Sequence, residues 1–282
     1  MPISALDIRN MVTREDDFGH EMRVGRAIRS VPAMELKHGG TYTDPVTQKP
    51  RQFDYRCWLR KESACLSLAV ECKNLSPAVP LVMCGTKRQE NEAFHDVIEA
   101  RRGLFKRRSA VIQGLSSITR RASRENAFYS ANHFVGKSLV RIQADKVPMV
   151  RTQDADIYDK WVQALSSAVG LAESACRIPQ EATQNRFFSS ILPIVVVPDG
   201  VLWNAVYDEN GNILTGPAQV EECELFVGKT IELGEKFTPS FHLFTFSHVH
   251  FFTLAGFSSF LSKMAVNDQA WAKLFTDKSI EI

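Results

Sequence analysis

Hydrophobic and polar residues alternate along two adjacent segments, and this alternation predicts a pair of β-strands. Within residues 66–74 the large apolar side chains share one face and small ones the other, as in Leu66, Leu68 and Val70 against Ser67 and Ala69. This is the two-residue period of a strand. Residues 53–59 have a similar pattern, and the polar residues 61–63 fit a turn. We therefore expect a hairpin.

The pattern along the rest of the chain predicts further helices and strands. Helices are expected over 16–30 and 154–176, where apolar residues recur at helical spacing. A first strand over 33–43 precedes the hairpin, and the β-branched run over 187–197 predicts a strand buried on both faces. Residues 85–150 are expected to be the least regular part. The other expected elements are strands over 201–207, 224–227 and 241–253, a hairpin turn over 209–212, and helices over 255–264 and 269–275.

Charged residues stand at the end of the second strand of the hairpin. Alternation places the side chains of Glu71 and Lys73 on one face, with Cys72 on the other. Asp54, near the start of the neighbouring strand, is expected to lie beside them. Ionised groups are rarely found there unless they are paired or bind something. Because Mg²⁺ takes one or two carboxylates and binds substrate phosphate directly, these residues suit metal-assisted phosphoester chemistry.

The pattern Asp54…Glu71-x-Lys73, preceded by Thr-Tyr-Thr-Asp-Pro-x-Thr-x-Lys-Pro-Arg over 41–51, resembles the PD-(D/E)xK, or restriction-endonuclease-like, nuclease superfamily. The residue before Asp54 is Phe53, where the pattern of that family has Pro. The resemblance implies an α/β fold with a mixed central sheet flanked by helices, and hydrolysis of phosphodiester bonds with Mg²⁺, or Mn²⁺ in its place. It also implies that Asp54 and Glu71 hold the metal, while Lys73 orients or activates water and stabilises charge developing on the phosphate.

Two supporting residues enter through the same resemblance. An early helix of the family can contribute an acidic residue to the metal site, which indicates Glu21, with a solvated helix Glu as the alternative. In some branches the helix after the E-x-K strand carries a Gln near the site, which indicates Gln163, with a solvated Gln as the alternative. The resemblance divides a single nuclease-like domain, 1–282, into a core (15–75 and 154–210), a basic insertion (76–153) and a C-terminal β/α extension (211–282).

Positive charge is concentrated in one part of the chain. The formal net charge of the 282 residues is only +2, which by itself does not indicate a polyanionic partner. From Lys87 to Arg124, however, there is a local excess of six positive charges, close to Phe94, Phe105 and Phe128. Such a stretch suits a nucleic-acid backbone, with a solvated face as the alternative. The candidate contacts are Arg101, Arg102, Lys106, Arg107, Arg108, Arg120 and Arg121.

Cysteine usage and the ends of the chain favour a cytoplasmic protein. The six cysteines contain no C-x-x-C pair, which indicates reduced thiols and no zinc site. The first residues lack the basic and apolar regions of a signal peptide, and no apolar run has membrane-spanning length. We expect His242, His248 and His250 to be structural or interface residues, because their neighbours are apolar. The phenylalanine-rich C-terminal region suits a core or a homodimer surface.

Three hypotheses for the function remain open from the sequence. The first is a Mg²⁺-dependent endonuclease that cuts DNA, with RNA as an alternative substrate. The second is a nucleic-acid-binding protein of the same fold that does not cleave, and the third is a structural protein in which the hairpin is incidental. Under the first, we expect Asp54 and Glu71 to lie at the edge of the sheet, so that alanine at either position removes cleavage and leaves the fold intact.

Overall fold

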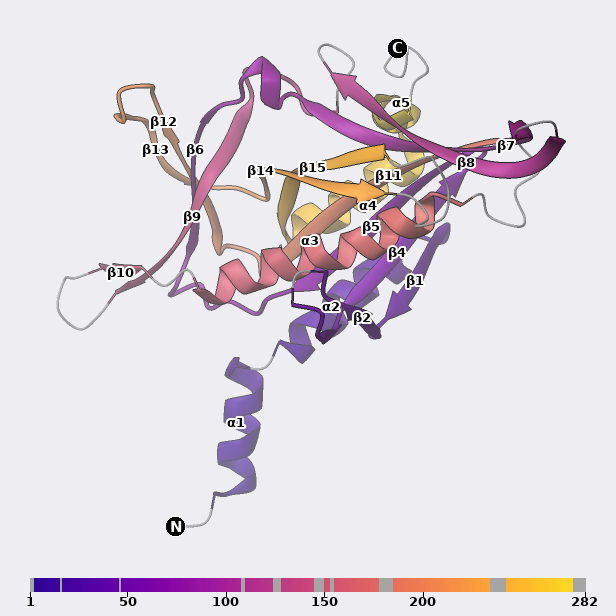
Figure 1. Ribbon diagram of the computed structural model, residues 1–282. Coiled ribbons are helices and arrows are strands. Elements are labelled where there is room, and N and C mark those ends of the chain that lie inside the picture. The colour runs from indigo at the N-terminus through magenta and orange to yellow at the C-terminus, as the bar shows by residue number, and fades with distance from the viewer. Residues whose placement is uncertain are drawn as a thin grey trace.

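The computed structural model describes residues 3–15, 17–45, 47–107, 110–123, 128–144, 150–152, 155–177, 185–233 and 242–275. These residues form a mixed α/β fold with few helices, built on one large mixed sheet (Figure 1). The described helices are α1 (Ala5–Glu15), α2 (Phe18–Arg29), α3 (Ala155–Ala175), α4 (Leu254–Val266), α5 (Asp268–Phe275) and the short 3₁₀ helix η1 (Glu90–Glu92). In Figure 1, α1 extends away from the sheet.

Thirteen of the described strands belong to the large sheet. Their order is β1-β4-β5-β11-β15-β14-β9-β6-β12-β13, with β10 on β9 and the β7–β8 pair on β11. The strands are β1 (Met34–His38), β4 (Tyr55–Lys61), β5 (Ala64–Cys72), β6 (Leu81–Lys87), β7 (Phe94–Arg107), β8 (Ala110–Ser123), β9 (Phe134–Ala144), β10 (Val150–Thr152), β11 (Arg186–Val197), β12 (Leu202–Tyr207), β13 (Ile213–Gln219), β14 (Glu222–Leu233) and β15 (His242–Thr253).

The predicted hairpin is confirmed as the antiparallel pair β4–β5. Tyr55 lies opposite Val70, and Glu62, at a positive φ of 49°, lies in the turn between the strands. The alternation sends Tyr55 and Val70 toward a core shared with α2, α4 and α5. The other face of the hairpin, which includes Ala69, packs against α3. The two faces of β5 therefore lie in different environments, and all nine of its residues are buried.

Helix α3 crosses one face of the central strands, as Figure 1 shows. The predicted apolar stripe is confirmed: Leu165, Ala168 and Ala172 pack with Ala69 of β5 and Ile191 of β11. Small residues in this stripe let the helix lie close to the strands, which brings its polar residues within reach of the sheet.

The β-branched run is also confirmed as an interior strand. β11 pairs in parallel with β5 along most of its length, and every residue of it after Arg186 is buried. Its other side pairs with β7 over residues 186–189 and with β15 over residues 194–197. Pro193, which cannot donate a backbone hydrogen bond, lies between these two paired segments. The proline thus lies at the point where the strand beside β11 changes from β7 to β15.

The expectation of one strand over 33–43 was wrong. The structure has β1, which pairs with β4, and a separate strand β2 (Thr41–Thr43), which forms a small two-stranded sheet with β3 (Pro50–Gln52). Gly39 and Gly40 separate β1 from β2 and have positive φ angles of 64° and 139°. Glycine adopts such angles without steric cost, so the chain leaves the large sheet here.

The expectation that residues 85–150 are the least regular part was also wrong. The described residues there include β7 and β8, two strands of 14 residues each that pair in register over their whole length. Arginines on both faces of these strands obscure the apolar alternation by which a strand is usually detected. The paired strands form the long projecting hairpin at the right of Figure 1.

The C-terminal elements were largely predicted, and they join the centre of the sheet. β14, β15, α4 and α5 are confirmed, and the hairpin turn after β12 leads into β13, which was not predicted. Because β15 pairs in parallel with β11, the last part of the chain contributes to the same core as the first part. In the described part of the chain, no helix has the length and apolarity needed to cross a membrane.

Candidate active site

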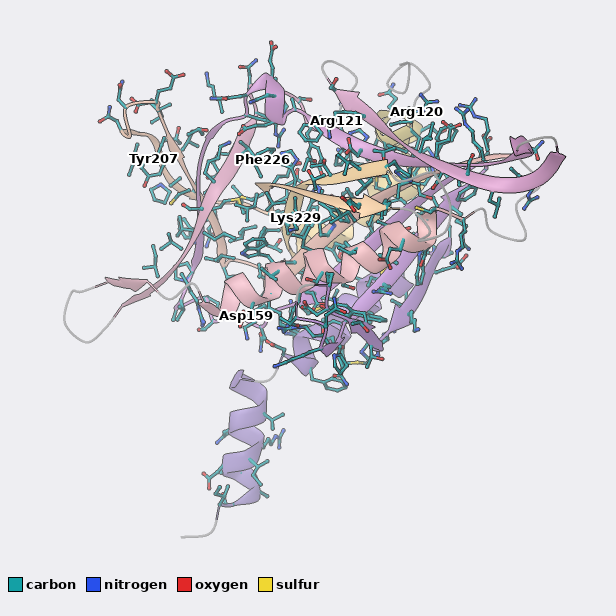
Figure 2. All side chains as sticks on the ribbon, viewed as in Figure 1. Arg120, Arg121, Asp159, Tyr207, Phe226 and Lys229 are labelled. Carbon is teal, nitrogen blue, oxygen red and sulfur yellow. The ribbon has the colours of Figure 1, made fainter. Side chains whose placement is uncertain are left out.

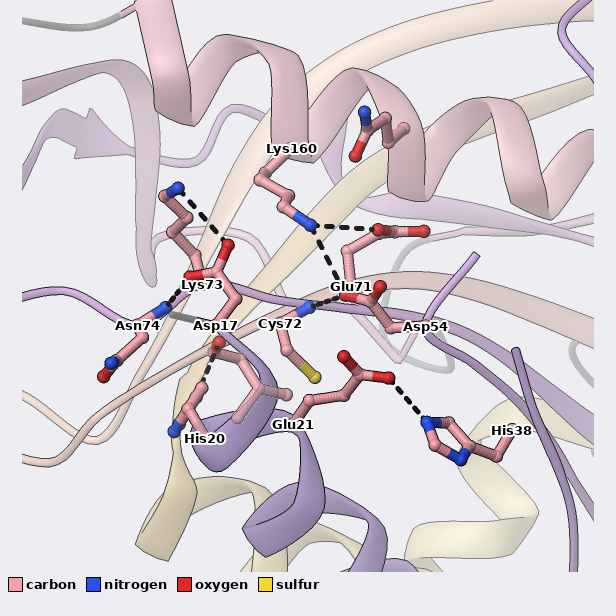
Figure 3. A network of polar contacts seen from close by, with 12 residues as sticks. Asp17, His20, Glu21, His38, Asp54, Glu71, Cys72, Lys73, Asn74 and Lys160 are labelled. Atoms are coloured by element: carbon pink, nitrogen blue, oxygen red, sulfur yellow. Dashed lines mark hydrogen bonds and ion pairs between the residues drawn. The ribbon is translucent and has the colours of Figure 1, made fainter. Parts of the chain in front are cut away.

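The hairpin brings Asp54 and Glu71 together on the face that α3 covers (Figure 3). Asp54 immediately precedes β4, and Glu71 is the second-last residue of β5. Since Tyr55 lies opposite Val70, Asp54 and Glu71 are neighbours at the same end of the two strands. The backbone N–H of Cys72 donates a hydrogen bond of 2.7 Å to Asp54 Oδ2, which fixes that carboxylate against the end of β5.

Lys160 of α3 completes this pair of carboxylates, and the sequence analysis missed it. Its Nζ lies 3.4 Å from Asp54 Oδ2 and 3.6 Å from Glu71 Oε2. Burial lowers the pKa of Lys160, but the charges of Asp54, Glu71 and Asp17 outweigh it and raise the pKa. A signal was available, because Lys160 is one helical turn before Ala164 and two before Ala168, both of which are buried on the sheet.

Glu71 is the least satisfied charged group of this cluster. Its side chain is only 1% exposed, and neither carboxylate oxygen has a hydrogen-bond partner. Burial and the nearby charge of Asp54 raise its pKa well above the usual range, and Lys160 offsets this only in part. The expectation that Glu71 lies at an edge of the sheet was wrong, because β5 has β4 on one side and β11 on the other.

Lys73 is near the cluster, but its amine is directed elsewhere. β5 ends at Cys72, so Lys73 lies just past the strand, and its Nζ is 3.4 Å from Asp17 Oδ2 at the start of α2. The other oxygen of Asp17 accepts a hydrogen bond of 2.7 Å from the backbone N–H of Asn74. Figure 3 shows Lys73 and Lys160 as separate ion pairs on neighbouring carboxylates.

The two supporting candidates lie in different places. Glu21 Oε1 is 2.6 Å from His38 Nε2, and the backbone carbonyl of Glu21 accepts a hydrogen bond from Tyr55, which faces α2. Glu21 thus lies on the face of the sheet opposite α3. Gln163 follows Lys160 by one turn on α3, and its backbone carbonyl accepts a hydrogen bond of 3.4 Å from Tyr42.

Two of the predicted nucleic-acid contacts, Arg101 and Arg120, bind a buried carboxylate together with Arg186, which was not predicted. Glu99 is fully buried, and its oxygens accept hydrogen bonds from Arg101, Arg120 and Arg186 at 2.6–3.0 Å. Burial alone would raise the pKa of Glu99, but the three arginines lower it to about 2. We call these four residues the Glu99 cluster. It has an excess of positive charge, and Arg101 and Arg186 are partly exposed.

The Glu99 cluster lies far from Glu71. Phe188 of β11 is the register partner of Glu99, whereas Val195 is the register partner of Glu71. Seven residues of a strand separate these positions, which corresponds to roughly 23 Å. The two carboxylates also face opposite sides of the sheet, because Phe188 packs toward α5. The cluster therefore does not extend the Asp54–Glu71 site.

The remaining basic candidates lie on or next to β7 and β8 in the sequence. Arg121 forms an ion pair of 2.8 Å with Asp96 and stacks on Phe94. Figure 2 shows Arg120 and Arg121 on the upper strands, well separated from Asp159, the neighbour of Lys160 on α3. Arg102 is half-buried, and its backbone N–H donates to the carbonyl of Asn185. The side chains of Lys106 and Arg107, and all of Arg108, lie outside the described residues.

The three C-terminal histidines have structural contacts. His250 shares a hydrogen bond of 2.6 Å with the hydroxyl of Tyr129, and His248 lies against the same ring. Burial lowers the pKa of His248 to about 2 and that of His250 to about 3, and the charge of Arg88 adds to both shifts. The ring nitrogens of His242 share hydrogen bonds with the hydroxyls of Ser117 and Thr119.

The donor set of the cluster fits a hard divalent cation. Among the described residues, no group of three or more His, Cys, Asp and Glu side chains could form a metal site, so a protein-only cage is absent there. Mg²⁺ does not need one, because it is usually bound by one or two carboxylates together with water and substrate phosphate. Glu71, a buried carboxylate without a hydrogen-bond partner beside Asp54, supplies this kind of donor.

Comparison of the chain with models of protein families, with curated proteins and with solved structures found no match.

Proposed function

We propose that this protein is a Mg²⁺-dependent phosphodiesterase that cleaves nucleic acid, with Asp54, Glu71 and Lys160 as its catalytic centre. A non-enzymatic role as a nucleic-acid-binding protein is the alternative that the test below separates from it. The proposal takes up the resemblance of Asp54…Glu71-x-Lys73 to the restriction-endonuclease-like nucleases, with one change. Lys160, which contacts both carboxylates, takes the place beside them that the pattern alone assigns to Lys73.

The observation that carries the proposal is the unsatisfied state of Glu71. Burying a carboxylate without hydrogen bonds is costly, and a purely structural site would be expected to relieve that cost. Here both oxygens of Glu71 lack a hydrogen-bond partner, Asp54 adds a second negative charge, and one lysine is shared between the two. A buried, strongly perturbed carboxylate beside a second titratable group is characteristic of a catalytic site.

The order of elements around the cluster supports the same assignment. Apart from the small β2–β3 sheet and the insertion that carries β6–β10, the chain runs α2, β1, β4, β5, α3 and β11, and these strands are adjacent in the sheet in that order. β1, β4 and β5 are antiparallel neighbours, whereas β5 and β11 are parallel. We infer that this unit is a restriction-endonuclease-like core, to which the other strands of the sheet are added.

Asp54 and Glu71 are the residues that would hold the metal. When bound, Mg²⁺ lowers the pKa of a coordinated water and neutralises charge on phosphoryl oxygens. Asp54 is held for this role by the N–H of Cys72. The rigid β5 backbone holds Glu71, since β5 is paired on both sides.

Lys160 acts on the substrate phosphate. Its ammonium group has three donor hydrogens and no acceptor, and its position between the carboxylates leaves donors for a phosphate oxygen at the same place. A fixed cation is most effective where negative charge increases in the transition state. Lys73 is paired with Asp17 at the start of α2, so it contributes positive charge near the site without contacting Asp54 or Glu71.

The proposal is tested by incubating the purified protein with plasmid, linear duplex DNA, single-stranded DNA and RNA. Mg²⁺ or Mn²⁺ is added, with EDTA as the metal-free control. We expect metal-dependent cleavage of at least one substrate, loss of that cleavage in Asp54→Asn, and wild-type cleavage in the matched control Glu35→Gln, which changes an exposed carboxylate on β1. Salt-sensitive binding of nucleic acid without cleavage of any substrate would contradict the proposal and favour the non-cleaving protein.

A further inference from the structure

A pocket of about 400 Å³ lies on the same face of the sheet as the Asp54–Glu71 cluster. The β2–β3 hairpin forms one wall of it and helix α3 forms another, while Arg56 of β4 lies between them. Volumes of this size are typical of sites for small ligands. The lining residues are Tyr42, Thr43, Pro45, Gln48, Arg56, Ser166, Val169, Gly170 and Glu173.

Arg56 is held rigidly in this pocket without a carboxylate partner. Its Nε and one terminal nitrogen donate to the hydroxyl and the carbonyl of Ser167, at 3.3 Å and 3.0 Å. The guanidinium also stacks on the ring of Phe53, 4.5 Å from the centroid, with the ring of Tyr42 at 5.8 Å. Within the described part of the chain, none of its contacts is an ion pair. A guanidinium has five donor hydrogens, so several remain for a ligand.

Several arginines in or next to the sheet have carboxylate partners. Arg101, Arg120 and Arg186 share Glu99, Arg121 is paired with Asp96, and Arg88 is paired with Glu224. Arg56 is partly buried and has no carboxylate within ion-pair distance among the described residues. The charge of Glu71 acts on it only from farther away, so its free donors can bind a ligand. Planar guanidinium groups bind phosphate oxygens in pairs, which makes arginine the residue expected at such a place.

Gly170 of α3 keeps one edge of the guanidinium accessible. A Cβ atom at this position would lie 3.1 Å from a terminal nitrogen of Arg56, closer than ordinary contact. Glycine inside a helix costs stability relative to alanine. The absence of a side chain here thus has a local cost, and its effect is to leave room beside the cation.

The pocket is next to the proposed catalytic centre. Asp54 contacts Lys160 and Arg56 contacts Ser167, both of α3, so the two side chains lie on the face that α3 covers. Because the residues are two positions apart in the chain, their Cα atoms are at most roughly 7 Å apart. Neighbouring phosphates of a nucleic-acid strand have a comparable spacing. A strand with one phosphate at Asp54 and Glu71 could therefore place an adjacent phosphate at Arg56.

We propose that this pocket binds a phosphate group of the substrate strand next to the bond that is cleaved, with Arg56 as the residue that binds it. The inference rests on the proposed function for the identity of the ligand, a nucleic-acid strand. The phosphate is either an internal phosphodiester or a terminal phosphate monoester. The exposed Glu173 on the same wall opposes the anion, but its charge is screened by solvent.

The test measures binding without metal, so that cleavage plays no part. A short fluorescein-labelled single-stranded oligonucleotide, with or without a 5′-phosphate, is titrated with the protein in EDTA and followed by fluorescence anisotropy. We expect Arg56→Gln to weaken binding about tenfold, corresponding to about 1.4 kcal/mol. The matched control is Arg60→Gln, the same change on the same strand at an exposed arginine paired with Glu35, and it should stay within twofold of wild type.

Two further variants separate binding from folding. Gly170→Ala should weaken binding severalfold while the thermal midpoint is unchanged or raised, because alanine favours the helix but crowds Arg56. Glu173→Gln should tighten binding two- to threefold, since it removes the opposing charge. Equal affinities of Arg56→Gln and Arg60→Gln, or unchanged binding by Gly170→Ala, would overturn the inference.

The two oligonucleotides identify the source of the phosphate. Tighter binding of the 5′-phosphorylated strand that disappears in Arg56→Gln would assign the pocket to a terminal phosphate. Equal binding of both strands, with the same loss in Arg56→Gln, would assign it to an internal phosphodiester. Loss of cleavage in Asp54→Asn with Arg56-independent binding would leave the proposed function standing without this subsite. Arg56-dependent binding by a protein that cleaves no substrate would support the phosphate site and contradict the proposed nuclease activity.

Discussion

Glu71 and Glu99 are both buried carboxylates of the same sheet, and their surroundings differ in one respect. Glu99 accepts hydrogen bonds from three arginines, which lower its pKa to about 2 despite its burial. Glu71 has no hydrogen-bond partner, and burial together with Asp54 raises its pKa. One carboxylate is satisfied by three arginines, whereas the other has no hydrogen bond and shares a single lysine with Asp54.

The comparison separates two uses of buried charge. At the Glu99 cluster the charges hold β7, β8 and β11 together, because the three arginines come from these three strands. At Glu71 a single lysine, Lys160, is shared between two carboxylates, so part of the negative charge stays uncompensated, which lowers stability and is typical of a functional site.

The largest difference is expected in activity. Glu71→Gln keeps the shape of the side chain and removes its charge, so cleavage should fall about 10³-fold. The free energy of unfolding should be unchanged or higher, since a buried carboxylate without hydrogen bonds is lost while Lys160 keeps its ion pair with Asp54. Metal-dependent cleavage and urea unfolding of the same preparation measure both. Near wild-type cleavage by this variant would remove Glu71 from the catalytic centre.

The same change at Glu99 should have the opposite effect. Glu99→Gln leaves three arginines without their shared carboxylate, and breaking a buried ion pair in this way costs about 3 kcal/mol of stability. Cleavage per folded molecule should stay at the wild-type level, because the cluster lies at the other end of the strands. Urea unfolding gives the stability, and active-site titration corrects the activity for the folded fraction. Loss of activity in fully folded Glu99→Gln would contradict the division.

Replacing Lys160 should reduce cleavage more than replacing Lys73. Lys160→Met should lower cleavage about 10²-fold, because it removes the cation shared by Asp54 and Glu71. Lys73→Met should lower it only severalfold, since the amine of Lys73 is paired with Asp17. Single-turnover rates at saturating Mg²⁺ compare the two variants. The reverse order would restore the role that the sequence pattern alone gives to Lys73.

The last prediction concerns stability in mild acid. Burial lowers the pKa of His95 to about 4, of His248 to about 2 and of His250 to about 3. The unfolded chain binds protons near the ordinary histidine pKa of about 6.5, whereas the folded protein does not. Stability is therefore fully present above that value and lost as the pH falls toward the folded-state values, by up to about 1.4 kcal/mol per pH unit for each histidine.

Urea unfolding at several pH values between 7 and 5 checks this expectation. The decrease should persist in Glu99→Gln, because the Glu99 carboxyl group titrates below this range in either state. His250→Gln should reduce the slope. An unchanged slope in His250→Gln would show that His250 does not contribute to the acid sensitivity.

Local patterns in the sequence determined a large part of this molecule. Alternation identified the β4–β5 hairpin, and its register alone brought Asp54 beside Glu71. Helical periodicity identified α3, and the β-branched run identified β11 as an interior strand. These elements were predictable because their faces are set by residues a few positions apart, and the hairpin joins strands that follow each other directly.

The tertiary structure decided which distant groups meet. Lys160 reaches Asp54 across 106 residues of chain, because the small residues of α3 pack the helix closely on the sheet. Glu71 is buried because β11, more than a hundred residues later, pairs with β5. Alternation shows which face a side chain takes but not what covers that face. For the same reason the arginines of β7 and β8 indicated a free basic surface, whereas folding places Arg101 and Arg120 on one buried carboxylate.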